Sequence, residues 1–322
     1  MKKKKILVTG AAGFIGFSLC KKLLLDTNYD IIGIDNLNSY YSLKLKKKRL
    51  NILKSDKKFK FYKIDLTNYN KLEKIFKNNN FKLIFNFAAQ AGVRYSFENP
   101  KSYCETNISG FNNLLSLVKK YKVPKLFFAS SSSVYGDLGP YPKSEDDSLN
   151  TLNIYSLSKL QNELIAKTYS KNSKTLFIGL RFFTIYGEWG RPDMLILKYL
   201  SYIKLKKTFE LFNYGNHSRD FTYINDAIDI VLKLSRKKFN NNFEIFNICS
   251  SNPIKITKII KLIEKMGFKG KIKRKPLHTA DVLKTYGNNR KLKKVLKKLS
   301  FTNYKNGVSN TVEWYKKYSN LI

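Results

Sequence analysis

Tyr155 and Lys159 are the two side chains of this sequence whose types and spacing best fit proton-transfer chemistry. Side chains four positions apart on a helix lie on the same face, so a helix here would place the ammonium group beside the phenol. A neighbouring positive charge favours the phenolate, brings its pKa toward neutral pH and suits it to act as a general base. Because this spacing is also common on protein surfaces, a catalytic role for the pair needs support from a second feature of the sequence.

A run of serines at residues 130–133 provides that signal. The run ends the apolar segment Leu126–Ser130, which we expect to be a buried strand. Ligands of α/β proteins bind at the carboxyl ends of strands, where a hydroxyl such as that of Ser131 can hydrogen-bond the reacting oxygen. The competing interpretation is an ordinary serine turn. We predict that Tyr155, Lys159 and Ser131 form one catalytic centre.

Three glycines, Gly10, Gly13 and Gly16, follow the apolar run at residues 6–8 and open a segment of helical periodicity. Glycines at this spacing permit a tight turn and a close approach of the backbone to a pyrophosphate, which the N-terminus of the following helix binds. Asp35 follows after about 20 residues, at the end of the next apolar run, where a carboxylate binds ribose hydroxyls. Since an acid here repels the additional phosphate of NADP, the pattern predicts an NAD site. We expect the positive nicotinamide of NAD to act together with Lys159 in bringing the pKa of Tyr155 toward neutral.

Apolar runs alternate with helix-period segments through the first 181 residues, which predicts an α/β fold with a Rossmann-type, doubly wound parallel sheet. We expect an NAD-binding domain over residues 1–181 that also includes about 220–247, and a smaller α/β region over 182–322 that mainly binds the substrate. The expected strands are Lys5–Thr9, Ile31–Asp35, Phe59–Asp65, Leu83–Phe87, Leu126–Ser130 and Leu176–Arg181. The expected helices lie around Ile15–Leu25, Leu72–Phe76, Gly110–Lys120, Ile154–Tyr169, Ile228–Leu234, Thr257–Met266 and Lys291–Leu299.

The chain of 322 residues carries a formal net charge of +38, with 61 lysines and arginines against 23 acidic residues. Lysines are spread over segments expected to face solvent, such as Lys44–Lys48 and Lys291–Lys298, rather than gathered in one groove, which disfavours a nucleic-acid site. Three scattered cysteines and two histidines argue against a disulfide framework and a metal site. Because no apolar segment is long enough for a signal peptide or a membrane span, we expect a cytoplasmic protein that does not bind membranes.

The glycine segment, the serine strand end and the Tyr155–Lys159 pair together resemble the extended short-chain dehydrogenase/reductase family, and in particular its NAD-dependent nucleotide-sugar epimerases. The resemblance covers nearly the whole chain. Asp65 matches the acid that contacts the adenine, and Asn86–Arg94 matches the strand whose backbone lines the cofactor. The cofactor contacts implied by the resemblance are Gly10, Gly13, Phe14, Ile15, Gly16, Asp35, Asp65, Leu66, Ala88, Ala89, Gln90, Tyr155 and Lys159.

Two segments, Gln90–Ser96 and Leu180–Met194, are similar to the signature of UDP-glucuronate 4-epimerases. In galactose-type relatives an asparagine usually stands at the position of Thr184. The resemblance implies that Thr184 and Arg191 receive the sugar carboxylate, with Ser96 and Arg94 nearby. Arginine suits this task because its planar group binds carboxylates bidentately. The substrate contacts implied in this way are Arg94, Ser96, Ser131, Ser132, Tyr155, Thr184, Arg191, Arg219 and Asp281.

Three residues depart from the family pattern. Glu188 replaces a usual proline, His278 stands where close relatives often carry glutamine, and Ala280 replaces a glycine. The catalytic side of the site therefore matches the family more closely than the nucleotide side.

The resemblance implies that the protein inverts C4 of a UDP-hexuronate, converting UDP-glucuronate to UDP-galacturonate for surface polysaccharide precursors. A tyrosinate would remove the C4 hydroxyl proton while hydride passes to NAD and returns to the other face of the 4-keto sugar. A UDP-glucose/UDP-galactose 4-epimerase is the main alternative, and a non-enzymatic cofactor-sensing protein of the same fold is another. Ser132 and Ser133 stand where 4,6-dehydratases carry an acid pair, which argues against dehydration. The family further implies a homodimer that pairs helices 110–120 and 154–169 of each subunit.

Overall fold

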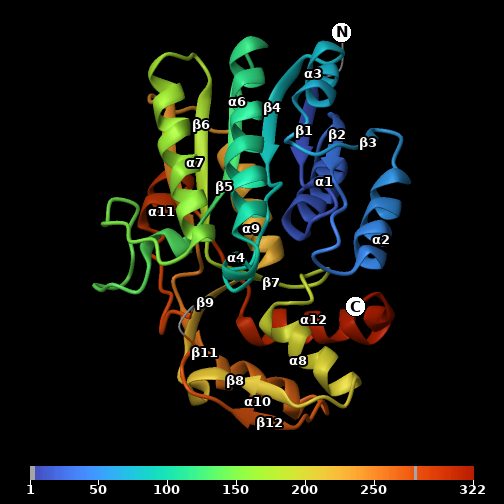
Figure 1. Cartoon of the computed structure of the whole chain (residues 1–322), viewed down its shortest axis with the longest axis vertical. Helices are drawn as coiled ribbons and strands as arrows, with labels where there is room; N and C mark the ends of the chain where they lie inside the picture. The colour runs from blue at the N-terminus through green and yellow to red at the C-terminus, as the bar shows by residue number, and fades with distance from the viewer. Residues whose placement is uncertain (1–3, 279–280) are drawn as a thin grey trace.

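The computed structural model describes residues 4–278 and 281–322 and contains a central parallel sheet of seven strands (Figure 1). Its strand order is β10-β6-β5-β4-β1-β2-β3, so the chain adds strands on one side of β1 and then returns to its other side at β4. Ligands of doubly wound sheets bind at this reversal. The strands are β1 (Lys5–Thr9), β2 (Asp30–Asp35), β3 (Phe59–Lys63), β4 (Phe81–Asn86), β5 (Lys125–Ser131), β6 (Leu176–Phe182) and β10 (Phe243–Ile248). The predicted fold class and six strands are confirmed, with strand ends shifted by at most two residues.

Helices cover both faces of the sheet and enclose two parts of the core. On one face α3, α6 and α7 pack side by side over buried residues such as Phe111 and Phe128. On the other face α1 contacts α2 and α9, and the core continues below the sheet to Tyr186 and Trp314. These helices are α1 (Phe14–Asp26), α2 (Leu43–Lys54), α3 (Tyr69–Lys77), α6 (Gly110–Lys120), α7 (Ile154–Lys171) and α9 (Ile224–Ser235).

A smaller region lies against the carboxyl ends of the strands, in the lower part of Figure 1. It contains a three-stranded sheet of order β11-β9-β7 and a parallel pair β12-β8, packed with α8, α10 and α12. Its elements are β7 (Thr184–Tyr186), α8 (Leu195–Lys204), β8 (Phe209–Leu211), β9 (Ser218–Tyr223), β11 (Pro253–Lys255), α10 (Ile256–Lys265), β12 (Ile272–Arg274) and α12 (Tyr304–Tyr318). Between them α9 and β10 return to the main sheet, where β10 pairs with β6. The division into two domains stays a prediction.

Short helices complete the described chain. They are α4 (Tyr95–Glu98), α5 (Pro100–Tyr103), a π-helix (Cys104–Ser109), α11 (Arg290–Leu296) and three 3₁₀ turns at Ser132–Tyr135, Phe212–Gly215 and Ser319–Leu321. None of the helices in residues 4–278 and 281–322 is long and apolar enough to cross a membrane.

The helix α2 is an element that the sequence analysis did not predict. It begins after Ser42, whose hydroxyl accepts a hydrogen bond from the amide of Leu45 and so satisfies one of the free amides of the first turn. Two cations of this helix, Lys46 and Arg49, are buried. The expectation that residues 44–48 face solvent is therefore wrong for Lys46, because its ammonium finds oxygen partners inside the protein.

Candidate active site

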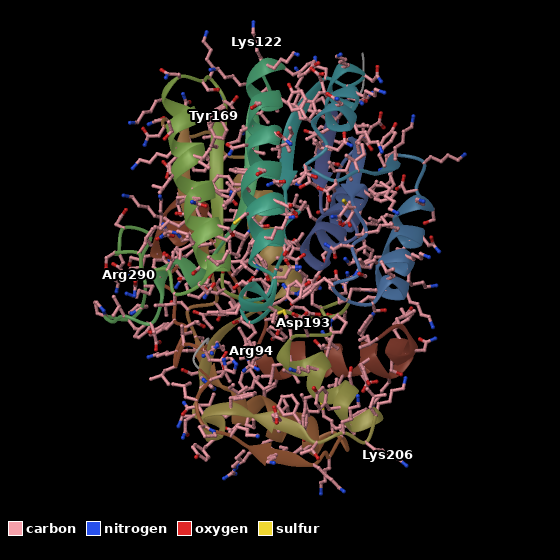
Figure 2. All side chains as sticks on the ribbon, viewed as in Figure 1. Arg94, Lys122, Tyr169, Asp193, Lys206 and Arg290 are labelled. Carbon is pink, nitrogen blue, oxygen red and sulfur yellow. The ribbon has the colours of Figure 1, made fainter. Side chains whose placement is uncertain are left out.

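A cavity of about 910 Å³ lies between the carboxyl ends of the main strands and the smaller region. Figure 2 labels two of its lining residues, Arg94 and Asp193, at the level where the two regions meet. The following residues predicted from the sequence line this cavity: Gly10, Gly13, Phe14, Ile15, Gly16, Asp35, Asp65, Leu66, Ala88, Ala89, Gln90, Arg94, Ser131, Ser132, Tyr155, Lys159, Thr184, Arg191, Arg219 and Asp281. The topology therefore brings predicted cofactor, catalytic and substrate residues to one place.

The glycine loop connects β1 to α1 along the wall of this cavity. Gly10 has a φ of 69° and lies so close to the next strand that a Cβ there would be 2.7 Å from the amide nitrogen of Ala88. A Cβ on Gly16 would be 2.1 Å from the carbonyl oxygen of Gly10. The residue before α1 is Gly13, which offers no side-chain cap. The amides of the first turn are thus left for a ligand, and a pyrophosphate fits this cradle.

Asp35 ends β2 and points its carboxylate into the loop region. Its oxygens accept hydrogen bonds from the amide of Ala12 at 3.1 Å and from that of Leu37 at 2.8 Å. Burial raises the pKa of Asp35, although these amides and the nearby Lys46 oppose the shift. Lys46 lines the cavity and donates to the backbone and side-chain oxygens of Asn38, both at 2.8 Å. A carboxylate held in this way can accept hydrogen bonds from ribose hydroxyls.

Asp65 lies on the adjacent part of the wall, after β3. It accepts hydrogen bonds from Asn36 at 2.7 Å and from the amide and hydroxyl of Thr67 at 2.9 and 2.8 Å. Burial acts to raise the pKa of Asp65, but these hydrogen bonds outweigh burial and hold that pKa below its usual value. The group is therefore a carboxylate at neutral pH and accepts hydrogen bonds only.

Tyr155 and Lys159 occupy the first turns of α7, which begins at a capping box formed by Asn153 and Ser156. The ammonium of Lys159 lies 5.9 Å from the centre of the Tyr155 ring and donates to the carbonyl of Ala129 at 3.0 Å. Ser131, at the end of β5, is near enough to the Tyr155 phenol to act on its pKa. The helix cap and the strand end thus bring the phenol, amine and hydroxyl together.

Burial is the largest influence on the pKa values of this pair. Burial raises the pKa of Tyr155, while the Ser131 side chain and the positive charge of Arg191 oppose that shift. Burial also lowers the pKa of Lys159 to about 8. The sequence prediction combined Lys159 with the positive nicotinamide of bound NAD, so it stays a prediction for the protein with its cofactor; among the protein groups alone, desolvation is the larger effect. A phenolate here needs further positive charge.

Arg191 approaches the catalytic phenol from the loop between β7 and α8. Its Nε and Nη2 atoms bind the Asp193 carboxylate at 3.0 and 2.5 Å, and the Tyr40 hydroxyl donates to the same carboxylate at 3.1 Å. The guanidinium is close enough to Tyr155 to affect its pKa. A positive group that can bind a carboxylate therefore lies beside the proton-transfer centre.

The far end of the cavity is closed by contacts between the two regions. Arg94 pairs with Asp281 at 2.9 Å and lies 4.2 Å above the ring of Phe212, which also packs edge-to-face against His278. Arg219 donates to the carbonyls of Ser218 and Leu283 at 2.9 and 3.2 Å. These arginines are fixed before any anion binds, so they form a preorganised positive wall.

Several sequence expectations need qualification. Ser96 is buried, donates to the carbonyl of Val93 at 2.7 Å and is not among the cavity-lining residues, so the fold does not bring it to the substrate site.

Glu188, one of the departures from the family pattern, accepts hydrogen bonds from the Tyr223 hydroxyl at 2.8 and 2.7 Å. Ala280 lies outside the described residues. Within the described chain, no group of three His, Cys, Asp or Glu side chains is arranged to hold a metal ion.

Some lining residues were missed by the sequence analysis, notably Asn36, Asn38, Tyr40, Tyr41 and Lys46. The signal that could have found them is a polar and aromatic run placed directly after a strand end that already carries Asp35. Loops at that edge of a doubly wound sheet contact ligands.

A doubly wound sheet with a glycine-lined cavity and a tyrosine–lysine pair at its strand ends defines a class of dinucleotide-dependent α/β proteins. Residues 6–249 match the NAD dependent epimerase/dehydratase family, and the chain belongs to that family. The expected family and its NAD dependence are thereby confirmed.

Individual relatives cover nearly the full chain. UDP-glucuronate 4-epimerase from Thermodesulfobacterium geofontis is 40% identical over 98% of this chain and 97% of its own. The crystal structure of UDP-glucuronic acid 4-epimerase from Bacillus cereus, in complex with UDP-glucuronic acid and NAD, matches with a TM-score of 0.91 at 31% identity, covering 97% of this chain and 99% of that one. The crystal structure of a Thermotoga maritima UDP-glucose 4-epimerase with UDP-glucose matches with a TM-score of 0.89 at 26% identity over 98% and 99% of the two chains.

Proposed function

We propose that this protein is an isomerase that inverts C4 of a UDP-hexuronate, interconverting UDP-glucuronate and UDP-galacturonate with bound NAD. The observation that carries the proposal is the position of Arg191, which lines the same cavity as Tyr155 and acts electrostatically on its phenol. An arginine beside the general base suits a sugar with a carboxylate next to the reacting carbon. The relatives named for UDP-glucuronate support this assignment.

In the proposed reaction Tyr155 accepts the proton of the C4 hydroxyl, and Ser131 holds that oxygen by a hydrogen bond. NAD, when bound, supplies reversible hydride acceptance at C4. Its positive nicotinamide also supplies charge that favours the phenolate. Lys159 binds the nicotinamide ribose, and its carbonyl contact with Ala129 fixes the amine at the base of the cavity. The 4-keto sugar would turn in the cavity and take the hydride back from the reduced cofactor on its other face, while Tyr155 returns the proton to the oxygen, which gives an alcohol of inverted configuration.

We assign the cofactor and substrate contacts to opposite sides of the cavity. The glycine loop, Asp35 and Asp65 hold NAD through the pyrophosphate, ribose and adenine. Thr184 and Arg191 receive the sugar carboxylate, and Ser132 lies near the sugar. Arg94, Arg219 and Asp281 hold the UDP portion, which the positive wall of the cavity attracts.

We further propose a cytoplasmic homodimer that forms through α6 and α7. Two leucines of α7, Leu157 and Leu164, are 39% and 55% exposed, which leaves apolar surface on this helix for a second subunit. Sedimentation at several concentrations tests the dimer. Substitution of both leucines by glutamate is expected to give a monomer.

The function is tested by incubating the purified protein separately with UDP-glucuronate and UDP-glucose, without added NAD, and separating the products. We expect UDP-galacturonate from the first substrate and much slower conversion of the second. Faster conversion of UDP-glucose would favour the neutral-sugar alternative. Absence of any product, with NAD present in the protein, would favour a cofactor-sensing role.

A further inference from the structure

Arg49 of α2 is a buried arginine that joins two loops of the active-site cavity. Its side chain is fully buried. The Nη1 atom donates to the carbonyl of Ala12 at 2.9 Å and to the hydroxyl of Tyr41 at 2.8 Å. The Nη2 atom donates to the carbonyls of Trp189 and Gly190, the latter at 3.0 Å. One guanidinium therefore divides its two terminal nitrogens between two distant parts of the chain.

The two parts are the glycine loop and the loop that carries Arg191. Ala12 lies between Gly10 and Gly13, and its own amide donates to Asp35. Trp189 and Gly190 directly precede Arg191. Because the backbone at both ends is tied to the same planar group, the spacing between the cofactor loop and the loop of Arg191 is set by the width of one guanidinium.

The loop before Arg191 has an unfavourable backbone conformation, which contacts such as those of Arg49 must hold in place. Trp189 has a φ of 60°, a conformation rarely adopted by a large side chain. Its ring packs against Phe17 of α1 at 5.4 Å and against Trp314 of α12 at 5.1 Å. These contacts fix the ring, and Arg49 fixes the carbonyl, so both ends of this residue are held.

The partners of Arg49 are unusual for a buried cation. Those in residues 4–278 and 281–322 are neutral oxygens, and its buried Nε has no hydrogen-bond partner among these residues. The Asp35 carboxylate is near enough to Arg49 to interact with it electrostatically, but none of the hydrogen bonds that Arg49 makes in the described chain goes to a carboxylate, and burying a guanidinium in this way is costly. A lysine has a compact ammonium group and cannot replace the fork, because it cannot span both loops with two separate nitrogens.

We infer that Arg49 is a positioning residue that sets Arg191 relative to the cofactor loop and thereby determines the preference for a UDP-hexuronate over a neutral UDP-hexose. The inference rests on the proposed function. It assigns to α2, whose buried Arg49 contacts both loops, a part in substrate selection. The carboxylate-binding group is placed correctly only when both nitrogens of Arg49 are engaged.

The test compares Arg49→Lys with a matched control, Leu53→Ala, on the same helix. Leu53 is buried and contributes packing alone, so its truncation weakens α2 without touching either loop. For Arg49→Lys we expect the KM for UDP-glucuronate to rise by about 10- to 100-fold and that for UDP-glucose by less than about threefold, since a displacement near 1 Å has effects of this order. For Leu53→Ala the melting temperature falls and the ratio of the two KM values is unchanged.

Dissociation constants for both nucleotide sugars, measured by calorimetry with NAD present, accompany the turnover data. A wild-type protein that binds UDP-glucuronate more tightly than UDP-glucose but does not epimerise it would refute the proposed function and still report on Arg49. Equal losses for both sugars in Arg49→Lys, or a loss of NAD retention alone, would overturn the inference. If Arg49→Lys does not fold, Arg49→Gln replaces it, because a single amide nitrogen can reach one of the two loops but cannot engage both. An unchanged sugar preference in that variant overturns the inference equally.

Discussion

The assignment of the sugar carboxylate to Arg191 makes a quantitative prediction for the double variant Arg191→Gln/Asp193→Asn. Asp193 binds the Nε and Nη2 atoms of Arg191, so we assign the sugar carboxylate to the remaining Nη1 group. Substituting Arg191 alone would leave the Asp193 carboxylate unpaired beside an anionic substrate. The double variant instead leaves a neutral pair. A hydrogen bond to a charged group contributes about 1.5–3 kcal/mol, which corresponds to a change of about 10- to 150-fold in kcat/KM.

The assay measures initial rates with UDP-glucuronate and with UDP-glucose on the same preparations, with products separated chromatographically. We expect kcat/KM for UDP-glucuronate to fall within that range and kcat/KM for UDP-glucose to change by less than about threefold, since a neutral sugar does not use the lost contact. Asp193→Asn alone serves as the control, because it retains the arginine. Equal losses with both sugars would show that Arg191 supports the fold or the nucleotide rather than the sugar carboxylate.

Three further predictions concern catalysis, cofactor binding and pH. Tyr155→Phe should lower turnover by at least about 100-fold while the protein retains NAD, since only proton transfer is removed; near-normal rates would refute the assignment. Gly16→Ala should reduce the NAD content of the purified protein, because its Cβ would lie 2.1 Å from the Gly10 carbonyl oxygen. Burial raises the pKa of Asp220 from an ordinary value of 3.8 to about 6, so its contribution to stability is full below about pH 4 and is lost, by about 3 kcal/mol, as pH rises through 6. Urea denaturation at pH 4.5 and 7, compared with Asp220→Asn, should show this difference, and parallel pH dependence in both proteins would contradict it.

The sequence was most informative where the chemistry is local. The tight turn at Gly10 and the contact at Gly16 involve residues of one loop, so their spacing alone predicts the dinucleotide cradle. The pairing of Tyr155 with Lys159 follows in the same way from helical geometry. Ser131 could be predicted to lie near this pair because the strand end and the helix start meet at one edge of a parallel sheet.

The sequence was least informative about properties that depend on burial, namely which cations lie inside the protein and how the pKa values shift. The lysines of residues 44–48 suggested a solvent-facing run, but α2 buries Leu45, Leu50 and Leu53, and Lys46 and Arg49 are buried as well. Nothing local distinguishes Lys46 from its neighbours, since only the fold supplies the oxygens of Asn38. Burial also acts on the pKa of Tyr155. The charge of Lys159 was visible in the sequence, whereas the desolvation that opposes it was not.

The use of arginine in so lysine-rich a chain follows from geometry. Three of its arginines bind a carboxylate through Nε and Nη2 together, as Arg94 does with Asp281, Arg181 with Glu163 and Arg191 with Asp193. Lysine supplies positive charge at many positions, but a single ammonium does not fix the orientation of its partner. The lysines therefore account for the overall attraction of anions, and the arginines determine the position at which an anion binds. Conversion of Arg191 to lysine should accordingly preserve charge and lose sugar preference, whereas conversion of exposed lysines should slow association without changing that preference.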